Sequence, residues 1–424
     1  MTTPDTIGRD LSRWLHDDAE HRVPDHLGEV LVRTAATRQR PWWSSPERWL
    51  PVETTLRLTP APRVAWLLLI LALVVAVVAA IAFAGAQRRL PEPFGLARDG
   101  AVLVSEDGDI LSVNPASGER QVLIGGPTFD FGPLFARDGT KLLFLRGAEG
   151  CGQPDCGAIL AVANADGTGI RELTPAMHLL DWVDWSPDGS QIAFLGERPY
   201  GDGHAINVVN TDGTGLRTLD VFRPAHMVTW LPGGEPEILF RGDQASDADP
   251  APGIFAVHPD GSGLRELSPS PPRYANDYNG LAASMDGNLI AYNNNDAGGQ
   301  FQVSILDQRT NVARVLPGPP GTAQYGAGFS PDATSVVYVR WWSDGRVRLV
   351  VAPVDGSSSG IELGPTIADG GESINNYAFA PDGKAVYANY DNDKTARLLP
   401  VDGSTPTELG HGDLALVGIQ RLAP

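Results

Sequence analysis

The two cysteines of the sequence, Cys151 and Cys156, stand close together in the segment CGQPDC. Two thiols at this separation in a loop with Gly and Pro can form a disulfide bond, which persists in oxidising compartments. The alternative is a pair of free thiols. Two cysteines without a neighbouring histidine are too few ligands for a metal site. We therefore predict a disulfide between Cys151 and Cys156 and no bound metal.

A serine motif at Gly356–Gly360, GSSSG, matches the G-x-S-x-G pattern of nucleophilic serines. That chemistry requires a turn from a strand into a helix, whereas this segment aligns with VDGSTP at 401–406, a turn between strands. The segment Asp391–Asp393 lacks the glycine and the distal glutamate of an EF-hand loop. The sequence thus predicts no catalytic residue and no cofactor, and we expect that the protein is not an enzyme.

Polar and aromatic side chains form a third candidate group, suited to binding through hydrogen bonds and ring contacts. They stand at the starts of successive predicted strands and in one predicted loop. Their members are Asp130, Asp181, His226, Asp277, Tyr278, Tyr325 and Asn376, with Trp341 and Trp342 in the loop. These side chains can act together only if the fold gathers the strands around one axis; the alternative is that water solvates each of them singly.

A repeat with a period near 48 residues organises these strands. A short strand ending in leucine recurs at spacings of 50, 46, 48, 49, 47 and 46 residues, at Leu123, Leu173, Leu219, Leu267, Leu316, Leu363 and Leu409. Turns alternate along each unit, as in WSPDGS (185–190) and NTDGTG (210–215), and glycine supplies the positive φ that such hairpins need. Each unit therefore predicts four short antiparallel strands, the pattern of a β-propeller blade.

Six complete units run from about residue 128 to residue 410. Residues 101–124 supply three further strands and residues 414–424 supply one more. A seventh blade shared by both ends of the domain would close the ring and remove its open edges. The predicted fold is therefore all-β, a seven-bladed propeller of four-stranded blades, with six blades and irregular ends as the alternative.

Propeller topology also sorts the connections by face. Both turns of each blade, between strands one and two and between strands three and four, lie on one face. The remaining connections, which include 148–157, 242–253 and 341–346, lie on the other face and vary from blade to blade. Variable loops on a rigid scaffold are where binding residues concentrate. We therefore predict a binding site on this variable-loop face and in the adjoining channel.

The segment WSPDGSQIAFLGERPYGDGHAINVVNTDGTGLRTL (185–219) resembles the repeat of the TolB-like, WD40-like propellers of bacteria. The resemblance covers roughly residues 96–424. It departs at Gly234, where Pro-Gly-Gly replaces Pro-Asp-Gly, and at Ala333, which replaces the turn glycine. It implies the fold and says little about function. TolB itself is a soluble periplasmic protein with an extra N-terminal domain. The present layout is also similar to membrane-anchored propellers of actinobacteria, which implies an anti-sigma-like role as one expectation.

One apolar segment, Val64–Ala86, has 23 residues without a charge, which is enough to cross a bilayer as a helix. It begins too far from the N-terminus for a signal peptide. Positive charges near its two ends are balanced, but Arg38, Arg40 and the predicted disulfide favour a cytoplasmic N-terminus. The predicted domains are a partly helical cytoplasmic tail (1–62), a transmembrane helix with flanking arginines (63–89) and an extracytoplasmic propeller (90–424) in the cell membrane.

The negative net charge of the chain argues against one class of binding partner, the nucleic acids. The chain has a net charge of −19, and residues 90–424 hold 21 basic and 42 acidic residues, a difference of −21. Such a domain repels phosphate backbones, so nucleic-acid binding is not expected. We predict a membrane-anchored module that binds an extracytoplasmic protein, peptide or glycan, with residues 1–62 contacting a cytoplasmic protein. The alternatives are a structural scaffold of an envelope complex, and an enzyme whose channel carboxylates, such as Asp181 and Asp277, do acid–base chemistry.

Overall fold

The computed structural model describes most of the C-terminal three-quarters of the chain. The described residues are 73, 95–148, 157–178, 180–197, 204–221, 226–233, 235–243, 252–267, 280–295, 299–367, 374–390, 395–411 and 413–423. The predicted tail, and the predicted span Val64–Ala86 apart from Leu73, lie outside them. Among the residues just given, no helix is long and apolar enough to cross a bilayer.

Twenty-eight strands form seven sheets of four antiparallel strands each, which we number as blades 1 to 7. Blade 1 holds β28 (Asp413–Leu422), β1 (Arg98–Glu106), β2 (Asp109–Val113) and β3 (Arg120–Ile124). Blade 2 holds β4 (Asp130–Phe135), β5 (Lys141–Gly147), β6 (Ala158–Asn164) and β7 (Arg171–Glu172). Blade 3 holds β8 (Asp181–Trp185), β9 (Gln191–Glu197), β10 (His204–Asn210) and β11 (Arg217–Thr218).

The other four blades follow the same plan. Blade 4 holds β12 (His226–Leu231), β13 (Glu237–Asp243), β14 (Pro252–Val257) and β15 (Arg265–Glu266). Blade 5 holds β16 (Leu281–Ala283), β17 (Leu289–Asn295), β18 (Phe301–Asp307) and β19 (Val312–Val315). Blade 6 holds β20 (Thr322–Phe329), β21 (Ser335–Trp342), β22 (Val347–Pro353) and β23 (Ile361–Ile367). Blade 7 holds β24 (Ile374–Phe379), β25 (Ala385–Tyr390), β26 (Thr395–Pro400) and β27 (Thr407–His411).

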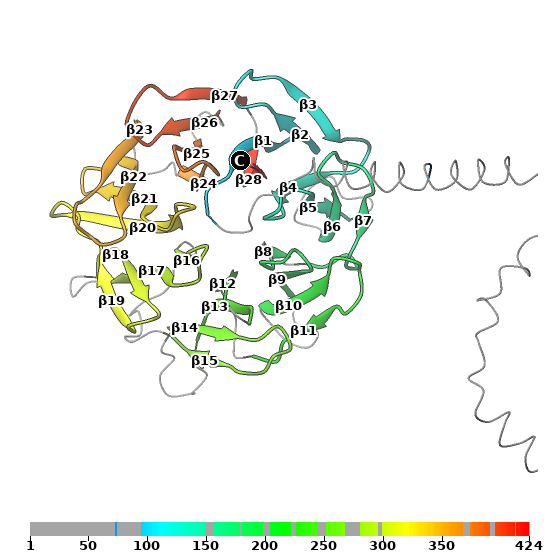
Figure 1. The fold of residues 1–424 in the computed structure, drawn as a ribbon, viewed down its shortest axis with the longest axis horizontal. Coiled ribbons are helices and arrows are strands. Elements are labelled where there is room, and N and C mark those ends of the chain that lie inside the picture. Colours follow the sequence, from blue (N-terminus) through cyan, green and yellow to red (C-terminus); the bar gives the residue numbers. More distant parts are fainter. Residues whose placement is uncertain are drawn as a thin grey trace, which may run out of the picture. The chain divides into compact units, whose positions relative to one another are not determined.

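The seven blades stand around a central axis, with the first strand of each near the axis and the fourth at the rim (Figure 1). Blade 1 joins the two ends of the domain, because the C-terminal strand β28 pairs with β1, with Val102 opposite Ile419. The predicted seven-bladed propeller with a shared closing blade is therefore confirmed. The six-bladed alternative is wrong, because β1, β2 and β3 accept β28 as a complete fourth strand.

The repeated turns arise from local hydrogen bonds that the sequence encodes. In WSPDGS, the carboxylate of Asp188 accepts bonds from the hydroxyl of Ser186 (2.6 Å) and the backbone N–H of Ser190 (3.0 Å). Gly189 then turns the chain at φ +68°. In blade 6 the matching residue is Ala333, which adopts φ +56° at a steric cost that glycine avoids. The turn therefore tolerates this departure from the repeat.

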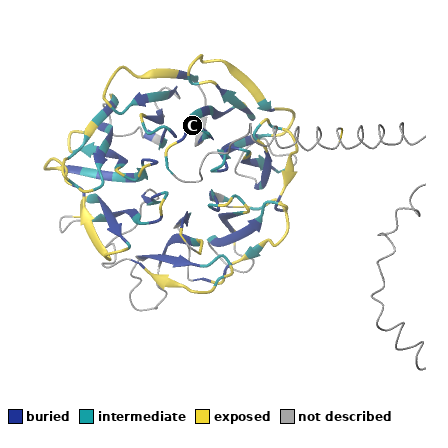
Figure 2. Ribbon diagram, viewed as in Figure 1, coloured by how far each residue is buried: buried dark blue, intermediate teal, exposed yellow. Residues whose placement is uncertain are grey.

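The core lies between blades rather than inside any one blade. Seven apolar clusters occur, one at each junction of neighbouring blades. Two buried tryptophans also tie neighbouring first strands: the Trp185 indole N–H donates to Leu134 O, and the Trp230 indole N–H donates to Asp184 O, each at 3.1 Å. Burial is deepest in the second and third strands, whereas the rim strands are exposed (Figure 2). Each blade is thus stable through its neighbours.

Candidate functional site

The antiparallel order confirms the predicted division of the connections between the two faces. The turn after each first strand and the turn after each third strand lie on one face, which we call the turn face. The variable-loop face carries the other connections, most of which lie wholly or partly outside the described residues. The predicted loop 341–346 is described throughout. This loop and the strand ends beside it form the candidate site.

An aromatic cluster lies at the junction of blades 5 and 6. It consists of Phe301, at the start of β18, Tyr325, in β20, and Trp341, near the end of β21. The Phe301 and Tyr325 ring centroids are 4.9 Å apart, and those of Tyr325 and Trp341 are 5.8 Å apart in an edge-on arrangement. All three rings are partly exposed. Such tilted contacts stabilise ring pairs by about 0.5–1.5 kcal/mol beyond burial, so the cluster is a pre-formed apolar anchor point.

A buried polar network fixes the backbone that carries Tyr325. The Asn293 side chain donates to Gln324 O (2.8 Å) and accepts the N–H of Gly326 (3.0 Å). From the other side, the Tyr377 hydroxyl donates to Tyr325 O at 3.2 Å. Burial raises the pKa of the Tyr377 hydroxyl above its usual value, which keeps it protonated as a donor. Blades 5 and 7 together therefore hold this segment of blade 6.

The hairpin that follows Trp341 in the chain carries charged groups. Trp342 begins a tight turn in which its N–H donates to Arg346 O at 2.9 Å. The Arg346 guanidinium lies 4.9 Å from the Trp342 ring centroid, and the Arg340 guanidinium lies 5.8 Å from it. Arg346 also donates to Asp344 at 2.8 Å, and this bond lowers the pKa of the Asp344 carboxyl. The Trp342 indole thus has a cation over it. Trp341 and Trp342 are consecutive residues of β21, so their side chains lie on opposite faces of blade 6.

Asp130, another predicted site residue, is fully buried in blade 2. It accepts two bonds from the Arg146 guanidinium, at 2.8 and 2.9 Å, and one from the Thr128 hydroxyl at 3.1 Å. The bonds to Asp130 raise the pKa of Arg146, which burial alone would lower. The carboxylate therefore anchors the entry of β4.

The remaining predicted residues are placed in part. Asp181 and His226 begin the first strands β8 and β12, and Asn376 lies in the first strand β24, but the side chains of Asp181 and His226 are not among those described. Four predicted residues lie outside the described part of the chain: Asp277, Tyr278, Cys151 and Cys156. The binding role of all these positions, and the disulfide, stay predictions.

The first strands share a feature that the sequence did not reveal. In five blades the first strand has a β-bulge with one residue in the left-handed region, at Gly132, Trp182, Met227, Gly326 and Asn376. Three of these are not glycine, and each costs about 1 kcal/mol or more in backbone strain. Bulges turn side chains away from the regular strand direction. Here they reshape the segments that border the channel.

Sequence reasoning found Tyr325, Trp341 and Trp342 but missed Phe301, Arg340 and Arg346. Phe301 was missed because it belongs to another blade, and only the closed ring brings it beside Tyr325. The signal for it was an aromatic residue directly after the variable segment 293–300. The serine motif Gly356–Gly360 lies in the turn between β22 and β23, which confirms its interpretation as a hairpin turn. Among the described side chains, no group of three or more His, Cys, Asp or Glu is arranged to hold a metal.

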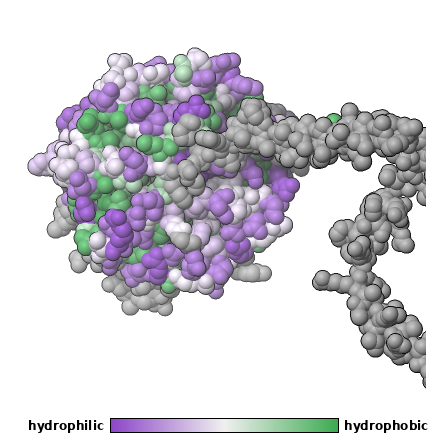
Figure 3. Space-filling view, in the orientation of Figure 1, coloured by the Kyte–Doolittle hydropathy of each residue, from purple (hydrophilic) through white to green (hydrophobic). Residues whose placement is uncertain are grey.

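The face drawn in Figure 3 is mostly hydrophilic, with apolar patches on the side of blades 5 to 7. No protein-family model and no curated protein matches the sequence. The structure is similar to that of a functionally unknown protein from Desulfotomaculum acetoxidans (TM-score 0.51, 14% identity, 77% of this chain and 99% of that chain). It is also similar to TolB from Acinetobacter baumannii, with a TM-score of 0.43 and 16% identity. The match covers 63% of this chain and 63% of that chain, so this chain spans less than two thirds of the length of that protein. At these identities the likeness concerns the fold alone.

A third similar structure changes one expectation. The S511A mutant of puromycin hydrolase, complexed with PGG, matches with a TM-score of 0.49 and 17% identity over 71% of this chain and 52% of that chain. Solved structures similar to this chain thus include an enzyme, and the expectation that the chain is not an enzyme is withdrawn. What the repeat predicted about architecture is confirmed: residues 95–423, where they are described, form a seven-bladed β-propeller of the kind seen in TolB-like structures.

Proposed function

We propose that this protein is a membrane-anchored, extracytoplasmic binding module whose propeller recognises a protein partner through the aromatic cluster at the junction of blades 5 and 6. The observation that supports this function is the contact of Phe301, Tyr325 and Trp341 beside the Trp342–Arg346 hairpin. Trp, Tyr and Arg are the residues that dominate binding energy at protein interfaces. In this proposal Val64–Ala86 is the anchor, and residues 1–62 report binding to a cytoplasmic protein in an anti-sigma-like manner.

The rigidity of the cluster supports a binding role. Hydrogen bonds from two neighbouring blades fix the backbone at Tyr325, and Trp341 packs against the apolar core between blades 6 and 7. A partner would therefore not have to order these rings on binding, which lowers the entropic cost of association. The Arg346 guanidinium beside the Trp342 ring supplies a hydrogen-bond donor for the partner at the rim of the site.

The test is photo-crosslinking in intact cells with benzoylphenylalanine in place of Trp342. We expect a discrete crosslinked protein, and we expect it to weaken at least about tenfold when Trp341→Ala or Tyr325→Ala removes an anchor ring. Val312→Ala, which truncates an exposed apolar side chain on the rim strand β19, should leave the crosslink unchanged. Equal loss in all three variants, or competition by free saccharides, would contradict recognition of a protein by this cluster.

Membrane topology needs a separate measurement. A membrane-impermeant maleimide should label Cys151 and Cys156 in intact cells only after reduction, if the propeller is extracytoplasmic and the disulfide forms. Labelling that requires cell lysis and no reductant would place the propeller in the cytoplasm. That result would contradict the proposed location while leaving the aromatic cluster as a binding site.

A further inference from the structure

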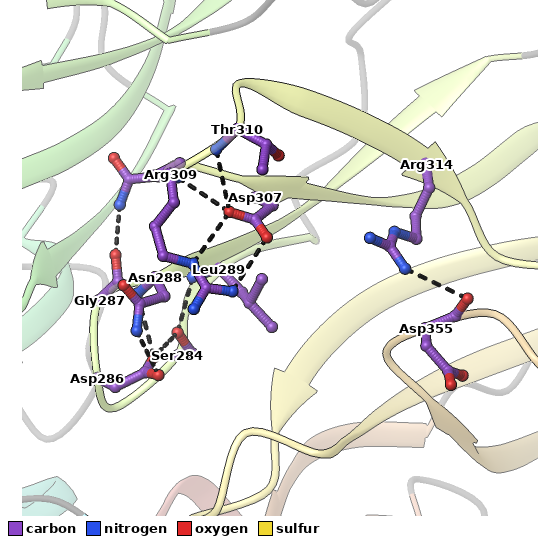
Figure 4. Close-up of polar contacts among 11 residues, drawn as sticks. Ser284, Asp286, Gly287, Asn288, Leu289, Asp307, Arg309, Thr310, Arg314 and Asp355 are labelled. Carbon is purple, nitrogen blue, oxygen red and sulfur yellow. Dashed lines mark hydrogen bonds and ion pairs between the residues drawn. The ribbon is translucent and has the colours of Figure 1, made fainter.

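A repeated arginine clamp joins neighbouring blades on the turn face. Blades 2, 3, 4 and 5 each have an Arg-x-Leu segment at the fourth strand. In three of these blades the guanidinium donates to a main-chain oxygen in the next blade, in the turn that follows its third strand. The three bonds are Arg171 to Asp212 O (2.6 Å), Arg217 to Pro259 O (2.8 Å) and Arg314 to Asp355 O (3.3 Å). Figure 4 shows the third of them. Each clamp thus places a main-chain oxygen against an arginine.

Blade 4 departs from this rule. Its arginine, Arg265, donates twice to Glu237 of the same blade, at 3.0 and 2.6 Å. The reason lies in the next blade, whose third turn reads Asp307-Gln308-Arg309-Thr310-Asn311 in place of an Asp-Gly turn. It presents the cation of Arg309 where Asp212 and Asp355 stand in the other blades, and two guanidiniums repel each other.

The turn of blade 5 is tied to its own blade as well. The Asp307 carboxylate accepts bonds from the Arg309 side chain (3.1 and 3.3 Å) and from its N–H (2.9 Å), and the Gln308 amide donates to Gly287 O (Figure 4). A groove of about 580 Å³ therefore lies between blades 4 and 5. Its charged lining consists of Glu235, Glu237 and Arg265 from blade 4, and Asp286 and Arg309 from blade 5.

Both arginines keep donors that face no protein acceptor. Among the described residues, the Nη1 atoms of Arg265 and Arg309 make no hydrogen bond, and the two side chains are 44% and 66% exposed. At the clamped junctions the arginine that matches Arg265 donates to a main-chain oxygen. Two guanidinium groups in one groove favour a ligand oxygen that carries negative charge.

The acidic side chains of the groove limit how much charge a ligand can carry. Asp286 is occupied by bonds from Ser284 and Asn288, and Glu237 is occupied by Arg265. Asp307, which is not part of the lining, is occupied by Arg309. Glu235 remains as an acidic group in the lining. A phosphate dianion would be repelled by these carboxylates more strongly than a single carboxylate would be. Among anionic groups, a single carboxylate therefore meets the least repulsion in this groove.

We propose that the groove between blades 4 and 5 is a second binding site, which takes a ligand with a single carboxylate through Arg265 and Arg309. The carboxylate could belong to an acidic side chain within a peptide or to a peptide C-terminus. This site is on the turn face, whereas the aromatic cluster stands on the variable-loop face, so it does not depend on the function proposed above.

The test is calorimetric titration of the full-length protein in detergent with four probes. Acetyl-Ala-Glu-Ala-amide carries a side-chain carboxylate, acetyl-Ala-Ala-Ala carries a terminal one, acetyl-Ala-Gln-Ala-amide is the neutral control, and inorganic phosphate is the dianion. We expect one of the two carboxylate peptides to bind and the neutral peptide and phosphate to bind at least about tenfold more weakly. Whichever carboxylate peptide binds more tightly identifies the source. Equal affinity of all four probes, or no binding by either carboxylate peptide, would overturn the proposal.

Variants separate the site from general effects on folding. Arg265→Gln and Arg309→Gln should each weaken the carboxylate peptide about tenfold, while Arg217→Gln, which removes a clamp elsewhere, should not. Glu237→Gln neutralises the internal competitor for Arg265, so it should strengthen binding. A gain of affinity cannot arise from damage to the fold. Unchanged affinity in both groove arginine variants, or weaker binding in Glu237→Gln, would contradict the proposal.

Discussion

Gly326 shows how a single residue sets up the candidate site. It has φ +65° in the bulge of β20, and its N–H bonds to Asn293. A Cβ atom at this position would lie 1.9 Å from the Tyr377 hydroxyl, the group that holds Tyr325 O. Both the backbone conformation and the lack of space therefore favour glycine at position 326, which directly follows Tyr325 of the aromatic cluster.

Gly326→Ala should destabilise the protein by at least about 2 kcal/mol, because left-handed strain and a steric overlap add together. Gly189→Ala is the matched control, since Gly189 has φ +68° but nothing within 4 Å of the added Cβ atom. It should cost only about 1 kcal/mol. Urea denaturation of both variants checks this, and equal losses would show that the contact with Tyr377 is relieved without cost.

Four aspartates lie in turns between the third and fourth strands of their blades, and their protonation makes the stability of the fold depend on pH in the acid range. Side-chain hydrogen bonds from Thr or Ser lower the pKa values of these carboxyls, with help from backbone N–H groups; they are Asp212, Asp260, Asp355 and Asp402. A lowered pKa in the folded state means that the unfolded state binds protons first as the pH falls. The stability that these groups contribute is present above about pH 4 and is lost as the pH falls through the lowered values.

Replacing all four aspartates with asparagine should therefore flatten the decline of the melting temperature below about pH 4. Asparagine keeps the acceptor oxygen, so the variant should fold at neutral pH. The converse change is Asn114→Asp, because Asn114 makes the same kind of turn by accepting the N–H of Ala116 at 2.9 Å. It should steepen the decline. Melting curves recorded across the acid range decide the matter, and parallel profiles in all three proteins would refute it.

At the scale of elements, arginine clamps hold several neighbouring blades together, and one junction lacks such a clamp. The clamp of Arg217 joins blade 3 to blade 4, whereas Arg265 serves only its own blade. Arg217→Ala should therefore cost about 1 kcal/mol, the value of one net hydrogen bond across a junction. Arg265→Ala removes a half-exposed ion pair and should cost less than about 0.5 kcal/mol. Chemical denaturation of the two variants is the measurement. An unchanged free energy of unfolding in Arg217→Ala would show that the clamp contributes nothing, and a larger loss for Arg265→Ala would contradict the predicted order.

The sequence predicted the elements better than the contacts between them. Blade number, strand order and turn positions followed from the period of about 48 residues and from Asp-Gly signals, because both are local properties of the chain. The Phe301–Tyr325 contact and the bonds of Asn293 join different blades, and no local pattern specifies them. The bulges at Trp182 and Met227 were also missed, since neither residue favours positive φ.

At the scale of the whole molecule, the ring depends on its last strand. β28 is the inner strand of blade 1, and Gly418 approaches the next blade so closely that a Cβ atom would lie 2.9 Å from Pro133 O. The side chain of Arg421 donates to Gly95 O and contacts the Met285 sulfur of blade 5. Without β28, the strand β1 would have an unpaired edge and the core between blades 7 and 1 would be open.

A chain that ends at His411 should therefore lose its cooperative unfolding transition and bind a dye for exposed apolar surface. A synthetic peptide of residues 413–424 should restore the transition, because the missing strand supplies the hydrogen bonds of β1 and the cover of the core. The matched control is the same peptide with Gly418→Val, whose side chain cannot fit against Pro133 O. A chain that keeps its melting temperature after the truncation would show that six blades close without the seventh. Rescue by both peptides would show that β28 adds only as an extended strand, without the close packing seen at Gly418.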